Sequence, residues 1–108
     1  MAEAMAASPA EGLSPELQAA FARLRDRFVA GLPQRWKEIE EAAPGPALEA
    51  ALHRLVGAAA SYGLGPLGAA AREAEALARQ ASAGAAPEKL AQALRNLRRC
   101  IDDIVTVR

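Results

Sequence analysis

The placement of proline constrains this chain more than any other feature of its sequence. Pro15, Pro46, Pro66 and Pro87 each stand at the start of a stretch in which apolar side chains recur every three or four residues. Proline is favoured in the first turn of a helix, where its missing N–H costs no hydrogen bond, and is disfavoured in helix interiors. The prolines therefore predict a series of helices, each beginning close to one of them.

The boundaries of these helices follow from the residues between the prolines. Ser14 provides an N-cap hydroxyl before Pro15, and Gly31 and Pro33 interrupt the apolar pattern that follows. We therefore expect two helices before residue 44, or one helix with a sharp kink, and three more helices beginning near residues 46, 66 and 87. The last helix carries an apolar seam with alternating steps of four and three residues, which is typical of a helical bundle: Leu90, Leu94, Leu97, Ile101 and Ile104.

Alanine accounts for more than half of the apolar residues, 29 in a chain of 108, and valine and isoleucine are rare. Alanine is the best helix former and a poor core filler, so the helices should approach one another closely. Short connections make neighbouring helices antiparallel. The predicted fold is all-α: an up-down antiparallel four-helix bundle with an additional N-terminal helix over residues 13–108, preceded by a flexible tail over residues 1–12.

Charge and cysteine content exclude several classes of function. The 13 basic and 13 acidic residues give a formal net charge of zero, which argues against non-specific binding of nucleic acid. No apolar run reaches the ~18 residues that a membrane span requires. The single cysteine, Cys100, flanks the apolar seam of the last helix and is interpreted as a buried small hydrophobe. We expect a cytoplasmic protein, and the modest number of large core residues favours a monomer.

The only histidine of the chain, His53, lies in the most informative helix. On a wheel at ~100° per residue, Leu48, Leu52 and Leu55 fall on the half of the helix opposite His53. The imidazole is therefore predicted to point away from the bundle interior. A lone histidine is usually an ordinary surface or core residue, so the residues around it decide whether it has a function.

Small side chains surround His53 where a solvated helix face normally carries long polar ones. Ala50, Gly57 and Ala60 lie on this face, together with Val56. Glycine within a helix costs ~1 kcal/mol relative to alanine, and such a cost without a packing gain often marks a functional site. Gly57 could instead admit a neighbouring helix, but its position opposite the leucines disfavours that explanation. The bare face would let the surface of another protein approach the imidazole.

Residues 53–63, HRLVGAAASYG, resemble the motif of histidine-containing phosphotransfer (HPt) domains of bacterial two-component phosphorelays. In that motif a histidine is followed by leucine, glycine, small residues and a final aromatic or apolar residue with glycine. The interruption at Leu32-Pro33 and the alanine-rich stretch from Leu67 to the acidic Glu75 also agree with the family. The resemblance covers residues 14–107 and implies that His53 accepts a phosphoryl group reversibly, typically on Nε2.

The resemblance also implies that a partner protein supplies part of the catalytic groups. An imidazole in water titrates near ~6.5, so much of it is neutral and nucleophilic at neutral pH. The sequence offers no cluster of metal ligands and no phosphate-binding loop, so we expect no metal and no cofactor of its own, and the partner must position and neutralise the phosphoryl group. In the family that partner is a response-regulator receiver domain, which holds Mg²⁺ and the acceptor aspartate, or a hybrid histidine kinase. The chain is thus expected to be a carrier and not an enzyme.

Two details of the site are specific to this sequence. Glu49, one turn before His53, can hydrogen-bond the second ring nitrogen and orient it, although an ordinary solvated glutamate is the simpler interpretation. The position three residues after the histidine, often lysine in the family, is Val56 here. Arg54 is either an alternative positive charge or an ordinary solvated residue at the flank of the helix. The residues expected to contact the partner are Glu49, Ala50, Arg54, Val56, Gly57 and Ala60.

Two other functions remain open from the sequence. The bundle could bind a receiver or kinase as a regulator without being phosphorylated, which the absence of a lysine near His53 favours. It could also be a structural helical adaptor, with the match at His53 fortuitous. In that case the arginines at 23, 25 and 27, or those at 95, 98 and 99, would be candidate partner surfaces, although solvated faces of amphipathic helices are the simpler interpretation.

Overall fold

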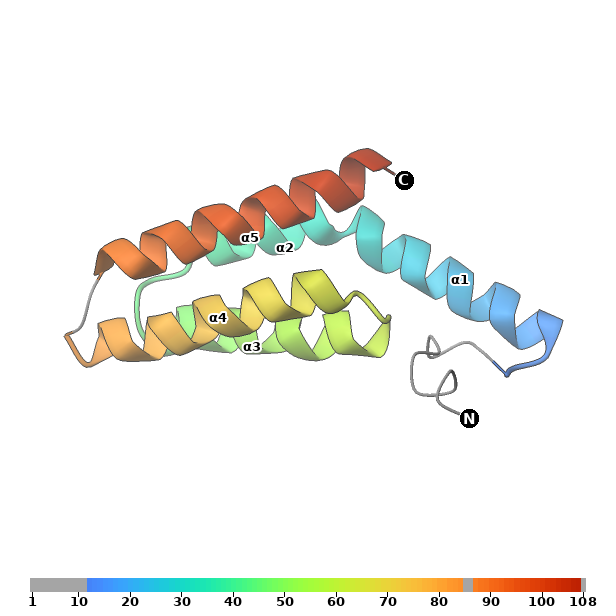
Figure 1. The fold of residues 1–108 in the computed structure, drawn as a ribbon, viewed down its shortest axis with the longest axis horizontal. Helices are drawn as coiled ribbons and strands as arrows, with labels where there is room; N and C mark the ends of the chain where they lie inside the picture. Colours follow the sequence, from blue (N-terminus) through green and yellow to red (C-terminus); the bar gives the residue numbers. More distant parts are fainter. Residues whose placement is uncertain (1–11, 85–86, 108) are drawn as a thin grey trace.

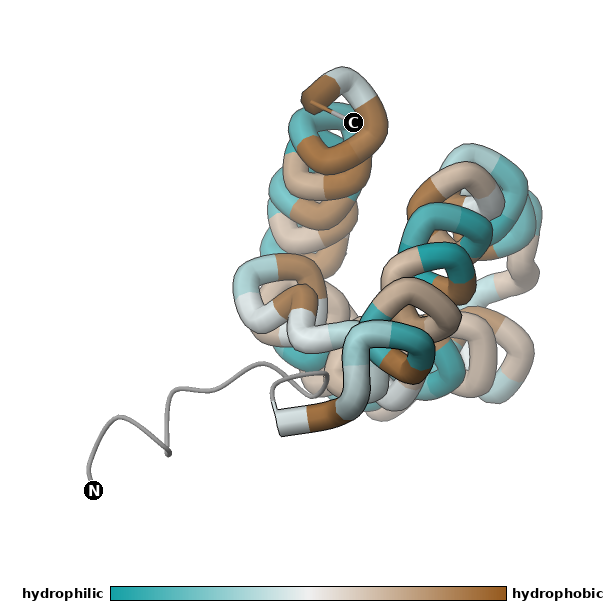
Figure 2. The backbone as a smooth tube through the Cα atoms, turned by 90° about the vertical axis from the view of Figure 1, so that its right-hand side faces the viewer, coloured by the Kyte–Doolittle hydropathy of each residue, from teal (hydrophilic) through white to brown (hydrophobic). Residues whose placement is uncertain are grey.

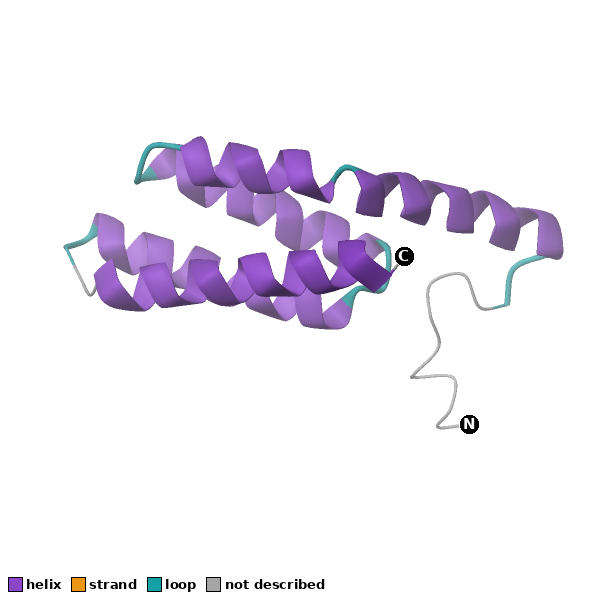
Figure 3. Cartoon of the chain, turned by 90° about the horizontal axis from the view of Figure 1, so that it is seen from above, coloured by secondary structure: helices purple, strands orange, loops and turns teal. Residues whose placement is uncertain are grey.

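The computed structural model describes residues 12–84 and 87–107 and shows helices joined by short loops (Figure 1). No strand occurs in these two ranges, as Figure 3 also shows. The expected tail lies almost wholly outside the described residues, so that prediction is not tested. The helices are α1 (Pro15–Ala30), α2 (Leu32–Glu41), α3 (Pro46–Ser61), α4 (Gly65–Ser82) and α5 (Pro87–Val107).

Four of these helices form the predicted bundle, and α1 is the additional N-terminal helix. Helix α4 packs against α3 on one side and α5 on the other, while α2 completes the bundle by contacting both α3 and α5. Figure 1 shows α1 continuing from α2 and leading away from the other helices, which gives the molecule a longest dimension of 49 Å. The all-α prediction is confirmed.

The chain changes direction between α1 and α2 at Gly31. Pro33 has no N–H to donate to the carbonyl of Val29, and its ring would clash with that carbonyl in a continuous helix. Helix α1 therefore ends with the N–H of Gly31 bonded to the carbonyls of Arg27 and Phe28, at 3.1 and 3.0 Å. The sequence allows either two helices or one kinked helix here, and the structure has two helices.

Small residues fill much of the interface between α3 and α4. Gly68 is buried there, and a Cβ built on it would lie 3.6 Å from the Cβ of Ala59. Ala71, Ala74 and Ala78 are likewise buried on α4. These residues let the two helix backbones approach closely, as the alanine content predicts, so that a polar side chain of one helix can reach the other. Figure 2 shows hydrophilic and hydrophobic stretches following one another along the helices.

The apolar stripe of α1 is only partly buried. Phe28 lies in the core and stacks on Tyr62 with a centroid distance of 5.0 Å, and Phe21 contacts the same ring at 5.7 Å. Leu17 and Leu24 belong to the same stripe, but they are 55% and 46% exposed. The N-terminal part of α1 thus extends past the end of α3 and has an apolar face that the bundle does not cover.

Candidate functional site

Helix α3 carries the candidate site, and glycine turns define both of its ends. Gly45 has a φ of 111° immediately before Pro46, and Gly63 has a φ of 70° just after the helix. At the C-terminal end the N–H of Leu64 bonds the carbonyl of Ala59 at 3.0 Å, and that of Gly63 bonds Ala60 at 3.2 Å. This is a Schellman motif, which requires a left-handed residue at Gly63. The C-terminal end of the helix is therefore fixed by local interactions.

The two faces of α3 differ as the helical wheel predicts. Leu48, Leu52 and Leu55 are at most 5% exposed and pack into the core. The side chain of His53 points outward and is 74% exposed. The bundle therefore anchors the helix through its leucines and leaves the imidazole accessible from solvent.

The orientation of the His53 ring is set by a residue on the neighbouring helix. Nδ1 of His53 lies 2.9 Å from Oε2 of Glu75 on α4. The hypothesis that Glu49 provides this hydrogen bond is wrong, because Glu75 occupies that place. Glu49 instead accepts a hydrogen bond from the hydroxyl of Ser82 at 2.8 Å, and its other oxygen lies 3.9 Å from Nε of Arg79. It supports the α3–α4 contact and not the ring.

Glu75 is a charged residue placed within a buried apolar stripe. Only 6% of the residue is exposed, and it lies among the buried alanines of α4. Burying a carboxylate is costly unless its oxygens have partners. Oε2 receives a second hydrogen bond, from Arg79 at 2.7 Å, one turn along the same helix. His53, Glu75 and Arg79 thus form a connected polar group across the α3–α4 interface.

This arrangement determines which nitrogen of His53 is available for chemistry. Oε2 of Glu75 already accepts a hydrogen bond from Arg79, and a carboxylate oxygen can only accept, so Nδ1 of His53 carries the hydrogen of the bond between them. In a neutral imidazole the lone pair available for reaction then lies on Nε2. Among the described residues Nε2 has no hydrogen-bond partner. The ring is therefore oriented by Glu75 and has an exposed nitrogen that can act as a nucleophile.

The bare face around His53 is largely as predicted. Ala50, Arg54, Gly57 and Ala60 are all exposed. A Cβ built on Gly57 would meet nothing within 4 Å, so the glycine does not admit a neighbouring helix. Val56 differs from the expectation, because it is half-buried and packs against the core.

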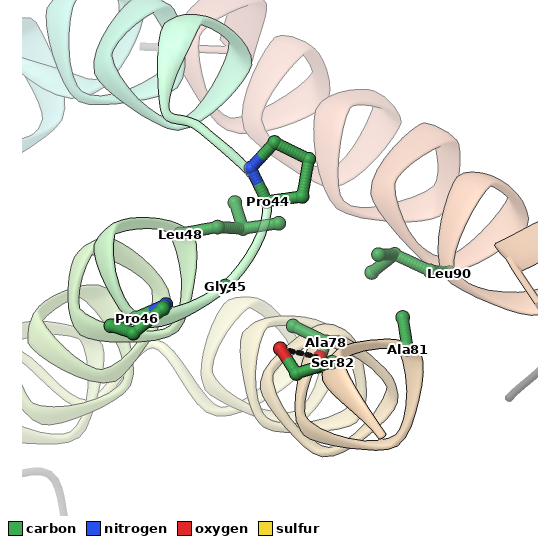
Figure 4. A pocket seen from close by; sticks show the side chains of 8 residues that line it. All are labelled: Pro44, Gly45, Pro46, Leu48, Ala78, Ala81, Ser82 and Leu90. Carbon is green, nitrogen blue, oxygen red and sulfur yellow. Dashed lines mark hydrogen bonds between the residues drawn. The ribbon is translucent and has the colours of Figure 1, made fainter. Parts of the chain in front are cut away.

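A hollow at one end of the bundle offers little that could support chemistry. The hollow drawn in Figure 4 lies at the end of the bundle nearest Pro44 and is lined mainly by apolar side chains such as Leu48 and Leu90. Its one side-chain hydroxyl, that of Ser82, already has two acceptors within the protein, Oε2 of Glu49 at 2.8 Å and the carbonyl of Ala78 at 3.1 Å. Groups of acidic, histidine and cysteine side chains suited to a metal ion are absent from residues 12–84 and 87–107. Over the same residues no helix is long and apolar enough to cross a membrane.

Cys100 does not take part in the site. It lies on α5, which packs against α4 and α2 but not against α3. The thiol is half-buried at the edge of the core, in partial agreement with the prediction that it is a small buried hydrophobe. Burial, and secondarily the neighbouring Asp103, raise the pKa of the Cys100 thiol above its ordinary value. The thiol is therefore neutral at physiological pH.

Glu75 is the residue whose role sequence reasoning missed. A helical wheel of α4 places it next to Ala71, Ala74 and Ala78, which form the apolar stripe of that helix. A single acid within such a stripe needs a partner from another helix. The sequence contains that signal, but only the pairing of α3 with α4 shows that the partner is His53.

Comparison with known proteins gives one match. A model of the Hpt domain family matches residues 23–106, which is most of the chain and includes both His53 and Glu75. The comparisons with curated proteins and with solved structures find no match.

Proposed function

The chain belongs to the Hpt domain family, and on that premise we propose that it is a phosphocarrier in a two-component phosphorelay, with His53 as the residue that accepts and donates the phosphoryl group. Membership of the family implies phosphotransfer in phosphorelay signalling, with receiver domains and kinases as the partners. The specific role of this chain and of its residues is our proposal. The observation that carries it is the exposed His53 ring whose Nδ1 is bonded to the buried Glu75.

The proposed step is a reversible exchange between two proteins. The lone pair of Nε2 attacks the phosphorus of an aspartyl phosphate on a receiver domain. A P–N bond forms, the acyl O–P bond breaks, and the aspartate leaves as a carboxylate. The imidazole becomes positively charged while Nδ1 keeps its hydrogen, and the carboxylate of Glu75 stabilises that charge at 2.9 Å. Transfer onward is the same step in reverse.

The remaining catalytic parts must come from the partner. In-line phosphoryl transfer requires charge neutralisation around the transferring group. The described residues around His53 provide no phosphate-binding loop or set of metal-binding groups. We propose that the receiver domain supplies Mg²⁺ and the aspartate, and that the carrier has no ATP-dependent activity. Ala50, Gly57 and Ala60 form the surface on which the receiver lies, with Arg54 and Val56 at its edge.

Transfer from phosphorylated receivers tests this proposal. Purified receiver domains from the source genome are labelled with radioactive phosphate and each is incubated with the wild-type chain or with His53→Gln. We expect acid-labile, base-stable label on the wild type only. If the wild type takes no label from any receiver but still binds one, the chain is a non-phosphorylated regulator; if His53→Gln retains label, His53 is not the acceptor.

A further inference from the structure

A groove lies beside the proposed docking surface, where α1, α2 and the C-terminal end of α3 meet. It has a volume of about 440 Å³, many times the ~30 Å³ of a water molecule. Phe28 and Tyr62 form its apolar part with their stacked rings, and Leu24 extends that part along α1. The groove is therefore open, lined by apolar and polar surface in about equal parts, and large enough to receive a side chain from another protein.

The groove is continuous with the face that carries His53. Its near edge includes Ser61, whose hydroxyl donates to the carbonyl of Gly57 at 3.1 Å. Ser61 lies eight residues after His53, or about 12 Å along the helix at 1.5 Å per residue. A typical interface covers about 800 Å² on each partner, which corresponds to a disc of about 16 Å radius. A partner centred on His53 would therefore reach the groove.

Basic side chains surround this groove. Arg27 and Arg35 line it, and the guanidinium of Arg35 lies 5.2 Å from the centre of the Phe28 ring. Arg54 lies on the same flank of α3 as Ser61, seven residues earlier. None of the three arginines forms an ion pair within the described part of the chain. The charge favours an occupant that carries carboxylates.

The same charges disfavour a second copy of this chain as the occupant. In a pair of α1 helices that covered each other's apolar stripes, Arg25 and Arg27 would flank both sides of the contact. Like charges placed together across an interface are destabilising. The only acids on α1 are Glu16 and Asp26; Asp26 lies opposite the stripe, and Glu16 lies at the far end of the helix.

We propose that this groove is a specificity site of the carrier, which receives an apolar side chain flanked by carboxylates from the receiver domain docked over His53. The inference rests on the proposed function, because the receiver is the partner in both. Leu24, Phe28 and Tyr62 bind the apolar side chain, and Arg27 and Arg35 attract the surrounding acids. The groove contributes to docking and takes no part in the transfer step.

Matched pairs of variants test the proposal. Arg27→Glu and Leu24→Ser alter the groove. Arg23→Glu and Leu17→Ser make the same changes on α1 at exposed positions that do not line it. Each protein is assayed with the receiver that transfers fastest to the wild type, at increasing receiver concentration. Each is also labelled with phosphoramidate, a small phosphoryl donor that needs no docking surface.

We expect each groove variant to raise the half-saturating receiver concentration about tenfold or more, equivalent to ~1.4 kcal/mol, with the maximal rate kept within about twofold. The control variants should change the half-saturating receiver concentration less than about threefold. Phosphoramidate should label all the proteins equally. If the groove variants behave as their controls while transfer to His53 continues, the groove proposal is wrong and the carrier function stands. A wild type that accepts phosphate from no receiver overturns both. A wild-type dimer that dissociates on Leu24→Ser would assign the groove to a second copy.

Discussion

Gly57 allows the stability of α3 to be separated from its proposed role in docking. Glycine in a helix interior is about 1 kcal/mol less favourable than alanine. At Gly57 no steric penalty opposes that gain, because an added Cβ would meet nothing within 4 Å. Gly57→Ala should therefore increase the free energy of unfolding by about 1 kcal/mol, which corresponds to a rise in Tm of about 4 °C for a domain of this size.

Gly57→Gln should have opposite effects on stability and on transfer. Glutamine has a helix propensity close to that of alanine, so the free energy of unfolding should rise by about 0.5 kcal/mol. Its side chain would project from the bare face into the space that a docked receiver needs. Displacement of reacting atoms by about 1 Å can cost about 100-fold in rate. We expect a loss of that size in transfer from a phosphorylated receiver.

Urea unfolding followed by circular dichroism gives the stabilities, and rapid-quench transfer of radioactive phosphate gives the rates. Ala91→Gln is the control, because it adds the same bulk at an exposed position of α5, the helix that lies diagonally across the bundle from α3. A native transfer rate in Gly57→Gln would refute the docking surface. If Gly57→Ala does not raise the free energy of unfolding, the argument that Gly57 destabilises α3 and serves docking instead is refuted.

Three further predictions concern other parts of the molecule. Glu75→Gln should slow transfer to His53 by about tenfold or more, because the amide can turn its NH₂ towards Nδ1 and favour the other tautomer of the imidazole. The half-saturating receiver concentration should not change. An unchanged rate in stopped-flow transfer would show that the hydrogen bond has no positioning role. Leu52→Ala removes a side chain with no exposed surface and should lower the free energy of unfolding in urea by about 2–5 kcal/mol; a loss below 1 kcal/mol would contradict the core assignment. Alkylation of Cys100 by iodoacetamide requires the thiolate, and because the pKa of this thiol is raised, the rate should be slow at pH 7 and still be rising above pH 9; a plateau by pH 8 would contradict the cause assigned to the shift.

Much of the fold was predictable because it depends on local features. Proline at helix starts, glycine at turns and the spacing of leucines are interactions within a few residues, so Pro46, Gly63 and Leu52 could be interpreted from sequence alone. The outward orientation of His53 followed from the same periodicity. At Gly31 the sequence allows two helices or one kinked helix, because whether Pro33 kinks or ends a helix depends on how the segments on either side pack.

The residues that were misjudged depend on contacts between helices. Glu49 and Glu75 are both acids near His53, and only the pairing of α3 with α4 shows that Glu75 reaches Nδ1. The wheel placed Val56 on the open face, but its position near the edge allows it to pack against the core. The exposed stripe of α1, including Leu24, could not be distinguished from a core stripe, since periodicity does not show how far a helix extends beyond its neighbours.

The position of the phosphoryl group on the imidazole tests the central claim most directly. The chain, labelled with ¹⁵N at His53, is phosphorylated by a receiver domain and studied by ³¹P and ¹⁵N NMR spectroscopy under alkaline conditions that preserve phosphohistidine. Because Glu75 holds Nδ1, the account predicts phosphorus bonded to Nε2, with Nδ1 still protonated. Phosphorus on Nδ1, or on any residue other than His53, would contradict it.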